Sequence, residues 1–225
     1  MQGLTALELL LHNAKSDMLA TGRPNTYRCR FAQSITVNLG RMTREILASW
    51  SDGGAFQKVW AAPGPDNPVY LGASETSLEL IKAFELALQN ARDHRIVPAI
   101  GLGPKRRVFR PVLWRSGLGM VLIHGNIAGA HKLFSKGGLA DSYLAAARQT
   151  DASAPDALES IETEFDLLLE TTGGLSTIAQ PFKQPTTRNR LLGAGFPLKN
   201  IRQQAVARFK RAAGLSIGFN AADGD

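Results

Sequence analysis

The sequence of 225 residues contains a single cysteine, Cys29, so no disulfide can form within the chain. It has no apolar run near the roughly 18 residues that a membrane-spanning helix needs. Its first residues lack the basic region, apolar stretch and cleavage site of a signal peptide, so nothing in the sequence as given directs export. The short signatures of zinc peptidases, phosphate-binding loops and serine hydrolases are missing as well. The function must therefore be sought in weaker patterns.

The composition is that of a globular protein, with 44% hydrophobic and 20% charged residues. A formal net charge of +7 invites a nucleic-acid function. The charges are segregated, however, because basic residues gather in 105–110 and 199–211 and acidic residues in 156–170. Such segments can face one another in a bundle or remain solvated, and a basic patch alone is a weak sign of nucleic-acid binding. We therefore expect that nucleic acid is not the partner.

Apolar residues recur every three or four positions in five segments, which predicts amphipathic helices. The segments are 27–50, 80–91, 120–134, 158–168 and 198–212. Candidate N-caps are Asn25, Thr76 and Ser153, and Pro197 suits the first turn of the last helix. Glycine pairs at 53–54, 137–138 and 173–174 predict helix ends, and two long loops remain at 51–72 and 99–115. We predict an all-α, up-and-down bundle of amphipathic helices with short connections.

Two of the four histidines, His124 and His131, lie on one face of a predicted helix and suggest a metal site. Seven residues span roughly 10 Å of helix, whereas a Zn–N bond is only about 2.0–2.1 Å long. The two side chains therefore cannot chelate one ion directly, and we interpret them as histidines that flank an apolar stripe.

The carboxyl-terminal segment 214–225 is unusual for a chain end, because it combines apolar residues, glycines and acidic residues. Its apolar side chains predict docking into a core. Asn220, Asp223 and Asp225 can cap a helix end or bind a cation. Docking for stability alone is the simpler interpretation, since buried apolar residues usually serve packing.

This ending resembles the terminal G-x-x-x-G-F-N-x-x-D-G-D signature of the imelysin-like proteins, which are periplasmic helical proteins tied to iron uptake. Gly218, Phe219, Asn220 and Asp223 occupy signature positions. Trp114 and Arg115 begin a W-R-S-G segment that is similar to one in a branch of this family.

A second family motif, G-x-H-x-x-E, is matched in part near the amino terminus. Gly3 and Glu8 fill its first and last positions, and Thr5 stands where the histidine should be. In the full motif the histidine and glutamate share a helix face and can hold a metal together. A threonine hydroxyl replaces imidazole poorly, so the site departs from the family here. The alternative for Glu8 is an ordinary solvated or capping residue.

The resemblance implies that residues 1–225 form one imelysin-like helical domain that lacks the family's front helices. Family members carry an export signal or lipoprotein anchor and several helices before the G-x-H-x-x-E motif. We therefore expect a late start codon or a truncated copy. A bundle without its front helices would expose apolar stripes, which predicts a homo-oligomer, a repacked bundle or a marginally stable fragment.

Three functions compete at this point. The first is a non-catalytic periplasmic or envelope-associated protein of metal uptake. The resemblance implies iron as the ion and iron-uptake components of the envelope as partners. Glu8, Asp223 and Asp225 would be the oxygen ligands. The second is a metal-dependent peptidase, because the resemblance includes an insulin-cleaving membrane protease; it would need a general base and an activated water. The third is a basic helical module that binds nucleic acid.

Overall fold

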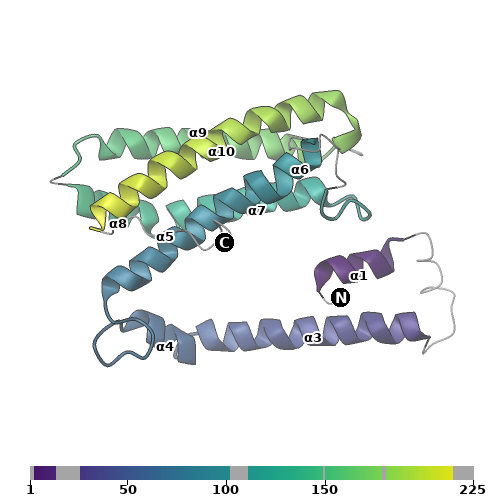
Figure 1. Ribbon diagram of the computed structural model, residues 1–225, viewed down its shortest axis with the longest axis horizontal. Helices are drawn as coiled ribbons and strands as arrows, with labels where there is room; N and C mark the ends of the chain where they lie inside the picture. The colour runs from purple at the N-terminus through teal and green to yellow at the C-terminus, as the bar shows by residue number, and fades with distance from the viewer. Residues whose placement is uncertain (1–2, 14–25, 102–110, 149, 179–180, 215–225) are drawn as a thin grey trace. The chain divides into compact units, whose positions relative to one another are not determined.

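The computed structural model describes residues 3–13, 26–101, 111–148, 150–178 and 181–214. Every regular element in these ranges is helical and none is a strand, which confirms the predicted all-α class (Figure 1). The sequence pattern explains this result, because apolar residues follow the helical period of 3.6 and not the strand period of two.

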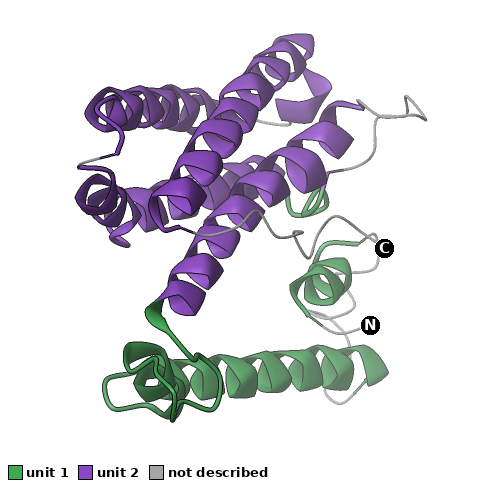
Figure 2. Cartoon of the chain, turned by 60° about the vertical axis from the view of Figure 1, so that its left-hand side comes forward, with its two compact units in different colours: residues 1–73, 112–118 green, residues 74–111, 119–225 purple. Residues whose placement is uncertain are grey.

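The chain divides into two compact units, which Figure 2 shows in green and purple. Unit 1 comprises residues 1–73 and 112–118, and unit 2 comprises residues 74–111 and 119–225. The described helices of unit 1 are α1 (Leu4–Leu11), α3 (Tyr27–Trp50) and α4 (Ala55–Ala61). The longer helices of unit 2 are α5 (Ala73–Gln89), α7 (Gly119–Ser135), α8 (Leu139–Ala147), α9 (Ala154–Ser176) and α10 (Pro185–Ala212). Its short elements are a π-helix (Asn90–Ile96), α6 (Val97–Ile100) and a 3₁₀ turn (Pro181–Lys183).

Unit 2 is a helical bundle, in which α9 packs against both α7 and α10 (Figure 1). The predicted stripe of α7 is confirmed, since all five of its members are buried: Met120, Ile123, Ile127, Ala130 and Phe134. The predicted stripe of α9 is also buried: Leu158, Ile161, Phe165 and Leu168. Amphipathic helices of this kind are stabilised mainly by burying one face against their neighbours.

Four phenylalanines meet at the centre of this bundle, one from each of α5, α7, α9 and α10. They are Phe84, Phe134, Phe165 and Phe209, and all are buried. Their contacting ring pairs have centroids 5.7–6.3 Å apart. Aromatic pairs at this separation contribute about 0.5–1.5 kcal/mol beyond the burial of their area. The cluster therefore fixes how all four helices turn their apolar faces inward.

Several predicted helix boundaries are wrong. Helix α9 begins after Ser153 as predicted, but it continues through Gly173 and Gly174 to Ser176. A Cβ atom on Gly173 would lie in ordinary van der Waals contact with the His124 ring of α7, at 3.4 Å, so this position inside the helix does not require glycine. The last helix begins at Pro185 and runs through Pro197. Proline is favoured at the first position of a helix, and in this helix Pro185 occupies that position.

The first predicted long loop contains a helix that the sequence did not indicate, and the second begins inside a helix. Helix α4 lies inside 51–72, where its Phe56 and Trp60 belong to an aromatic cluster with Trp50 and Tyr70. Helix α5 begins at Ala73, so Thr76 is not its N-cap. At the other loop the helix passes Pro98 and ends at Ile100, and residues 102–110 lie outside the described ranges.

Helix α3 has the predicted bounds, and Thr26 is its N-cap, because the Thr26 side chain accepts a hydrogen bond from the Cys29 amide at 3.4 Å. Asn25, the predicted cap, lies outside the described residues. The apolar face of α3 is largely exposed, since Ile35 is its one buried residue and Ile46 is 58% exposed. Unit 1 therefore carries its apolar stripe mostly on the surface, whereas unit 2 buries its stripes.

This contrast predicts unequal effects for the same substitution in the two units. Replacing the fully buried Ile127 by alanine should lower the free energy of unfolding by about 2–5 kcal/mol, because it leaves a cavity in the core. Ile46→Ala, the matched control on α3, should change it by less than about 0.5 kcal/mol. Urea unfolding of both variants measures the difference, and equal losses would contradict the assignment of α3 as exposed.

Candidate functional site

Two sequence segments that resemble family motifs meet within unit 1. The Glu8 carboxylate on α1 is only 7% exposed, and its Oε1 accepts hydrogen bonds from the amides of Arg115 and Ser116, both at 3.0 Å. The Ser116 hydroxyl lies 3.1 Å from the same oxygen. The partners are more than a hundred residues apart in the chain, so the fold and not the local sequence brings them together. Hydrogen bonds to an ionised carboxylate are stronger than those between neutral groups.

The turn at residues 112–118 presents these donors through an unusual backbone. Leu113 has φ 60° and Gly117 has φ 76°, and both values lie in the left-handed region. The Leu113 carbonyl accepts a hydrogen bond from the Leu118 amide at 3.1 Å, which closes the turn. The Ser116 hydroxyl can also reach that carbonyl at 3.1 Å, but it has one hydrogen and donates to one acceptor at a time. A left-handed leucine is strained, and the buried Glu8 carboxylate helps to hold it.

The side chains of Trp114 and Arg115 lie on the outside of this turn. The Arg115 guanidinium carbon lies 4.5 Å from the centroid of the Trp114 ring, a cation–π contact. The Trp114 ring is exposed and is covered in part by the arginine, whereas the backbone of the turn points toward Glu8.

The remaining motif residues lie either at the start of α1 or outside the described residues. Gly3 has φ 108° and forms the N-cap of α1, where a side chain would be strained. Thr5 is exposed on the first turn of the same helix. Residues 215–225, which hold Gly218, Phe219, Asn220, Asp223 and Asp225, lie outside the described residues.

The surroundings of Glu8 do not fit a metal ion by themselves. Three hydrogen-bond donors face its Oε1, whereas a metal shell needs further oxygen, nitrogen or sulfur ligands. Across the described ranges, no group of three or more His, Cys, Asp and Glu side chains is arranged to hold a metal. A metal role for Glu8 therefore depends on Asp223 and Asp225 and stays a prediction.

Each of the two histidines of α7 has its own partner on α9. The His124 Nδ1 lies 3.0 Å from the Thr172 hydroxyl, and the His131 Nε2 lies 2.6 Å from a Glu162 oxygen. Both contacts join α7 to α9 beside the apolar stripe, in agreement with their interpretation as flanking histidines. The two histidines therefore join two packed helices.

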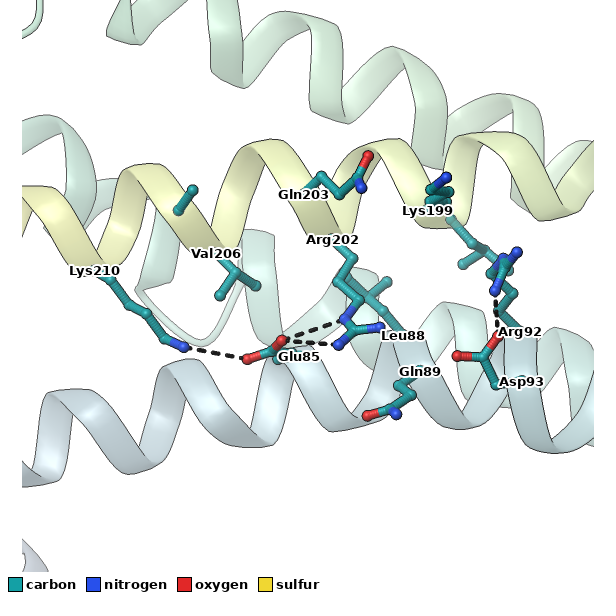
Figure 3. A pocket seen from close by; sticks show the side chains of 12 residues that line it. Glu85, Leu88, Gln89, Arg92, Asp93, Lys199, Arg202, Gln203, Val206 and Lys210 are labelled. Carbon is teal, nitrogen blue, oxygen red and sulfur yellow. Dashed lines mark hydrogen bonds and ion pairs between the residues drawn. The ribbon is translucent and has the colours of Figure 1, made fainter. Parts of the chain in front are cut away.

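The basic residues of α10 face carboxylates that the charge pattern did not single out. Arg202 and Lys210 both bind Glu85 of α5, at 3.2 Å and 3.4 Å (Figure 3). Arg208 binds Asp151, between α8 and α9, at 2.7 Å. Arg202, Arg208 and Lys210 thus do not pair with the acidic segment 156–170. The other basic segment, 105–110, lies outside the described residues.

Asp151 is the centre of a fully satisfied polar cluster. Its Oδ1 accepts hydrogen bonds from the Ser153 amide and hydroxyl, and its Oδ2 accepts them from the Tyr143 hydroxyl and from Arg208. The bonds from Ser153 and then from Tyr143 lower the pKa of Asp151 to about 2. Burial, followed by the bond to Asp151, raises the pKa of Tyr143. Since all four groups serve one another, the cluster joins α8, α9 and α10 and offers no free acid or base.

Comparison of the chain with protein-family models, with curated proteins and with solved structures finds no match. Among the described helices, none combines the length and the apolar character needed to cross a bilayer. Function must therefore be argued from the residues of this chain.

The position of Glu8 predicts a stability defect when its carboxylate is removed. Glu8→Ala leaves the amides of Arg115 and Ser116 without an acceptor, which should lower the free energy of unfolding by about 1–3 kcal/mol. Glu45→Ala removes an exposed carboxylate on α3 and should cost less than about 0.5 kcal/mol. Chemical denaturation measures both, and equal stability of the Glu8→Ala variant and the Glu45→Ala control would refute the structural role.

The Asp151 cluster predicts a pH-dependent contribution to stability. The folded pKa of about 2 lies below the ordinary value of 3.8, so the folded state binds the proton less tightly than the unfolded state. The contribution is complete above about pH 4 and is lost as the pH falls through about 2. The stability difference between wild type and Asp151→Asn should therefore shrink as the pH is lowered across this window. Asp141→Asn, on the exposed face of α8, is the control and should show no such trend.

Proposed function

We propose that the chain is an imelysin-like protein of the periplasm or cell envelope that serves iron uptake as a binding protein and not as an enzyme. The observation that carries the proposal is the junction of Glu8 with the Trp114–Gly117 turn, because two separately recognised motif segments meet there through 3.0 Å hydrogen bonds. In the same proposal the helices form an up-and-down bundle of the imelysin type, and components of the iron-uptake machinery are the partners.

The residues at the junction favour binding over peptide hydrolysis. A peptidase of this kind needs a positioned general base and an activated water. Thr5 stands in the position of the motif histidine and has no basic nitrogen. The Glu8 Oε1 accepts two amide hydrogen bonds and lies within reach of the Ser116 hydroxyl, so that oxygen is held as an acceptor within the fold. A carboxylate held in this way positions a turn better than it accepts a proton from water.

The metal part of the proposal rests on the two carboxylates of the chain end, Asp223 and Asp225. Carboxylate oxygens are hard ligands, which suit ferric iron and calcium better than soft ions. Because Glu8 is committed to the turn, we expect that Asp223 and Asp225 contribute more to metal affinity than Glu8 does.

The test is thermal unfolding of the full chain with ferric iron, zinc or calcium. An ion at about a hundred times its dissociation constant should stabilise the fold by about 2.7 kcal/mol. The double variant Asp223→Asn/Asp225→Asn should melt like wild type without metal and lose the metal-induced shift. Asp141→Asn should keep the shift.

Two results would contradict the proposal. If none of the three ions raises the melting temperature, the chain is not the metal-binding component that we describe. If the metal-loaded chain cleaves the insulin B chain, the peptidase alternative takes its place.

A further inference from the structure

A cavity of about 360 Å³ lies between α10 and the continuous helix that α5 and the π-helix form in unit 2. Side chains of both helices line it, as Figure 3 shows. Leu88, Leu198 and Val206 give it an apolar floor. The volume falls in the range of small-molecule sites, which combine an apolar lining with a few placed polar groups. No residue of this cavity belongs to the motif segments on which the proposed function rests.

The charged side chains around the cavity are unbalanced. Four cationic groups line it, Arg92, Lys199, Arg202 and Lys210, against the two carboxylates of Glu85 and Asp93. The formal charge of the lining is therefore +2. An anionic ligand with two negative charges would neutralise it, and low-dielectric walls strengthen such an attraction.

Lys210 gives the clearest indication that the cavity suits an anion. Its side chain is only 9% exposed, and its single hydrogen bond, to Glu85, is long at 3.4 Å. An ammonium group has three donors, so two of them have no partner among the described residues. Glu85 is shared, since its other oxygen takes both contacts from Arg202. A buried cation with unused donors is costly unless a further acceptor meets it.

The backbone around the cavity is irregular on both sides. Arg92 and Asp93 come from the π-helix, and π-helical turns occur frequently at functional sites. On the facing helix, Pro197 lies inside α10 directly before the first cavity residue, Leu198. The Arg92 Nε donates to the Gly195 carbonyl at 3.3 Å, so the two irregular segments are joined directly.

From these observations we infer that the cavity binds a small organic dianion, either a dicarboxylate or a phosphate monoester. Lys210 and Arg202 contact the negative groups, and Lys199 adds charge at the exposed rim. The apolar floor contacts the carbon chain.

The test is isothermal titration calorimetry on the full chain in metal-free buffer of low ionic strength. L-malate and glycerol 3-phosphate are the doubly charged probes, and lactate and glycerol are their counterparts with less negative charge. We expect one doubly charged probe to bind more tightly than its counterpart, and the preferred pair identifies the acid class. Absence of binding by all four probes, or equal binding within each pair, would overturn the inference.

Variants of the cationic lining localise the binding. Lys210→Met should weaken the affinity about tenfold to a hundredfold, because it removes a charged hydrogen bond. The exposed Lys199→Gln should weaken it about twofold to fivefold. Lys132→Met removes an exposed charge on α7, away from the cavity, and should leave the affinity unchanged. Equal losses in Lys132→Met and Lys199→Gln would show unspecific attraction and overturn the site. If Lys210→Met does not melt cooperatively, the affinities of Lys199→Gln and Arg92→Gln are measured in its place, and both should be weaker than that of Lys132→Met.

The inference and the proposed function can fail separately. Asp223→Asn/Asp225→Asn should abolish the metal-induced shift and leave malate or glycerol 3-phosphate binding unchanged. Lys199→Gln should weaken malate or glycerol 3-phosphate binding about twofold to fivefold and leave the metal-induced shift unchanged. A loss of both signals in either variant would contradict the assignment of two independent sites.

Discussion

The contact between Phe84 of α5 and Phe209 of α10 determines much of unit 2. Their ring centroids lie 6.1 Å apart, within the cluster that Phe134 and Phe165 complete. Each of these two rings is followed in the sequence by a charged residue, Glu85 and Lys210, and successive residues of a helix differ by about 100° in direction. Once the rings pack, the two charged side chains must face each other beside the core, and they meet at 3.4 Å. The apolar packing thus places the ion pair, because the burial of aromatic area is the larger and less directional term.

Glu8 illustrates how one residue can satisfy a functional motif and a structural demand at once. A buried carboxylate is stable only when its oxygens are well hydrogen-bonded. The turn at 112–118 supplies two amides and a hydroxyl, and in return the carboxylate holds a turn whose Leu113 lies in the left-handed region. Neither partner would be stable in this form alone. The junction is therefore a unit of structure first, and any ligand chemistry in unit 1 has to be built around it.

The helical class and the core stripes of unit 2 were predictable because burial on one face imposes a period that the sequence displays. Met120, Ile123 and Ile127 could be placed in the core without any structure. The boundaries were less predictable, because a glycine or proline serves more than one purpose. Gly173 lies inside α9 and Pro197 lies inside α10, so neither ends or begins a helix. The cavity could not be predicted at all, since Glu85 and Lys210 are 125 positions apart and their encounter depends on tertiary packing.

The ionic arrangement at Glu85 is poorly explained as a device for stability. Burying charges carries a desolvation penalty that a single pair offsets only with good geometry, and well-packed apolar residues often do better. Here one carboxylate faces two cations, of which Lys210 is nearly buried and bonded at 3.4 Å. Lys210 and Arg202 repel each other, and Lys210 leaves donors unused, so one carboxylate does not balance the two cations. An excess of positive charge along a cavity lining is useful when an anion completes it, and the apolar floor of Leu88, Leu198 and Val206 indicates that this anion has a carbon skeleton. The unfavourable charge balance of the cavity lining is thus the physical reason for assigning it to binding.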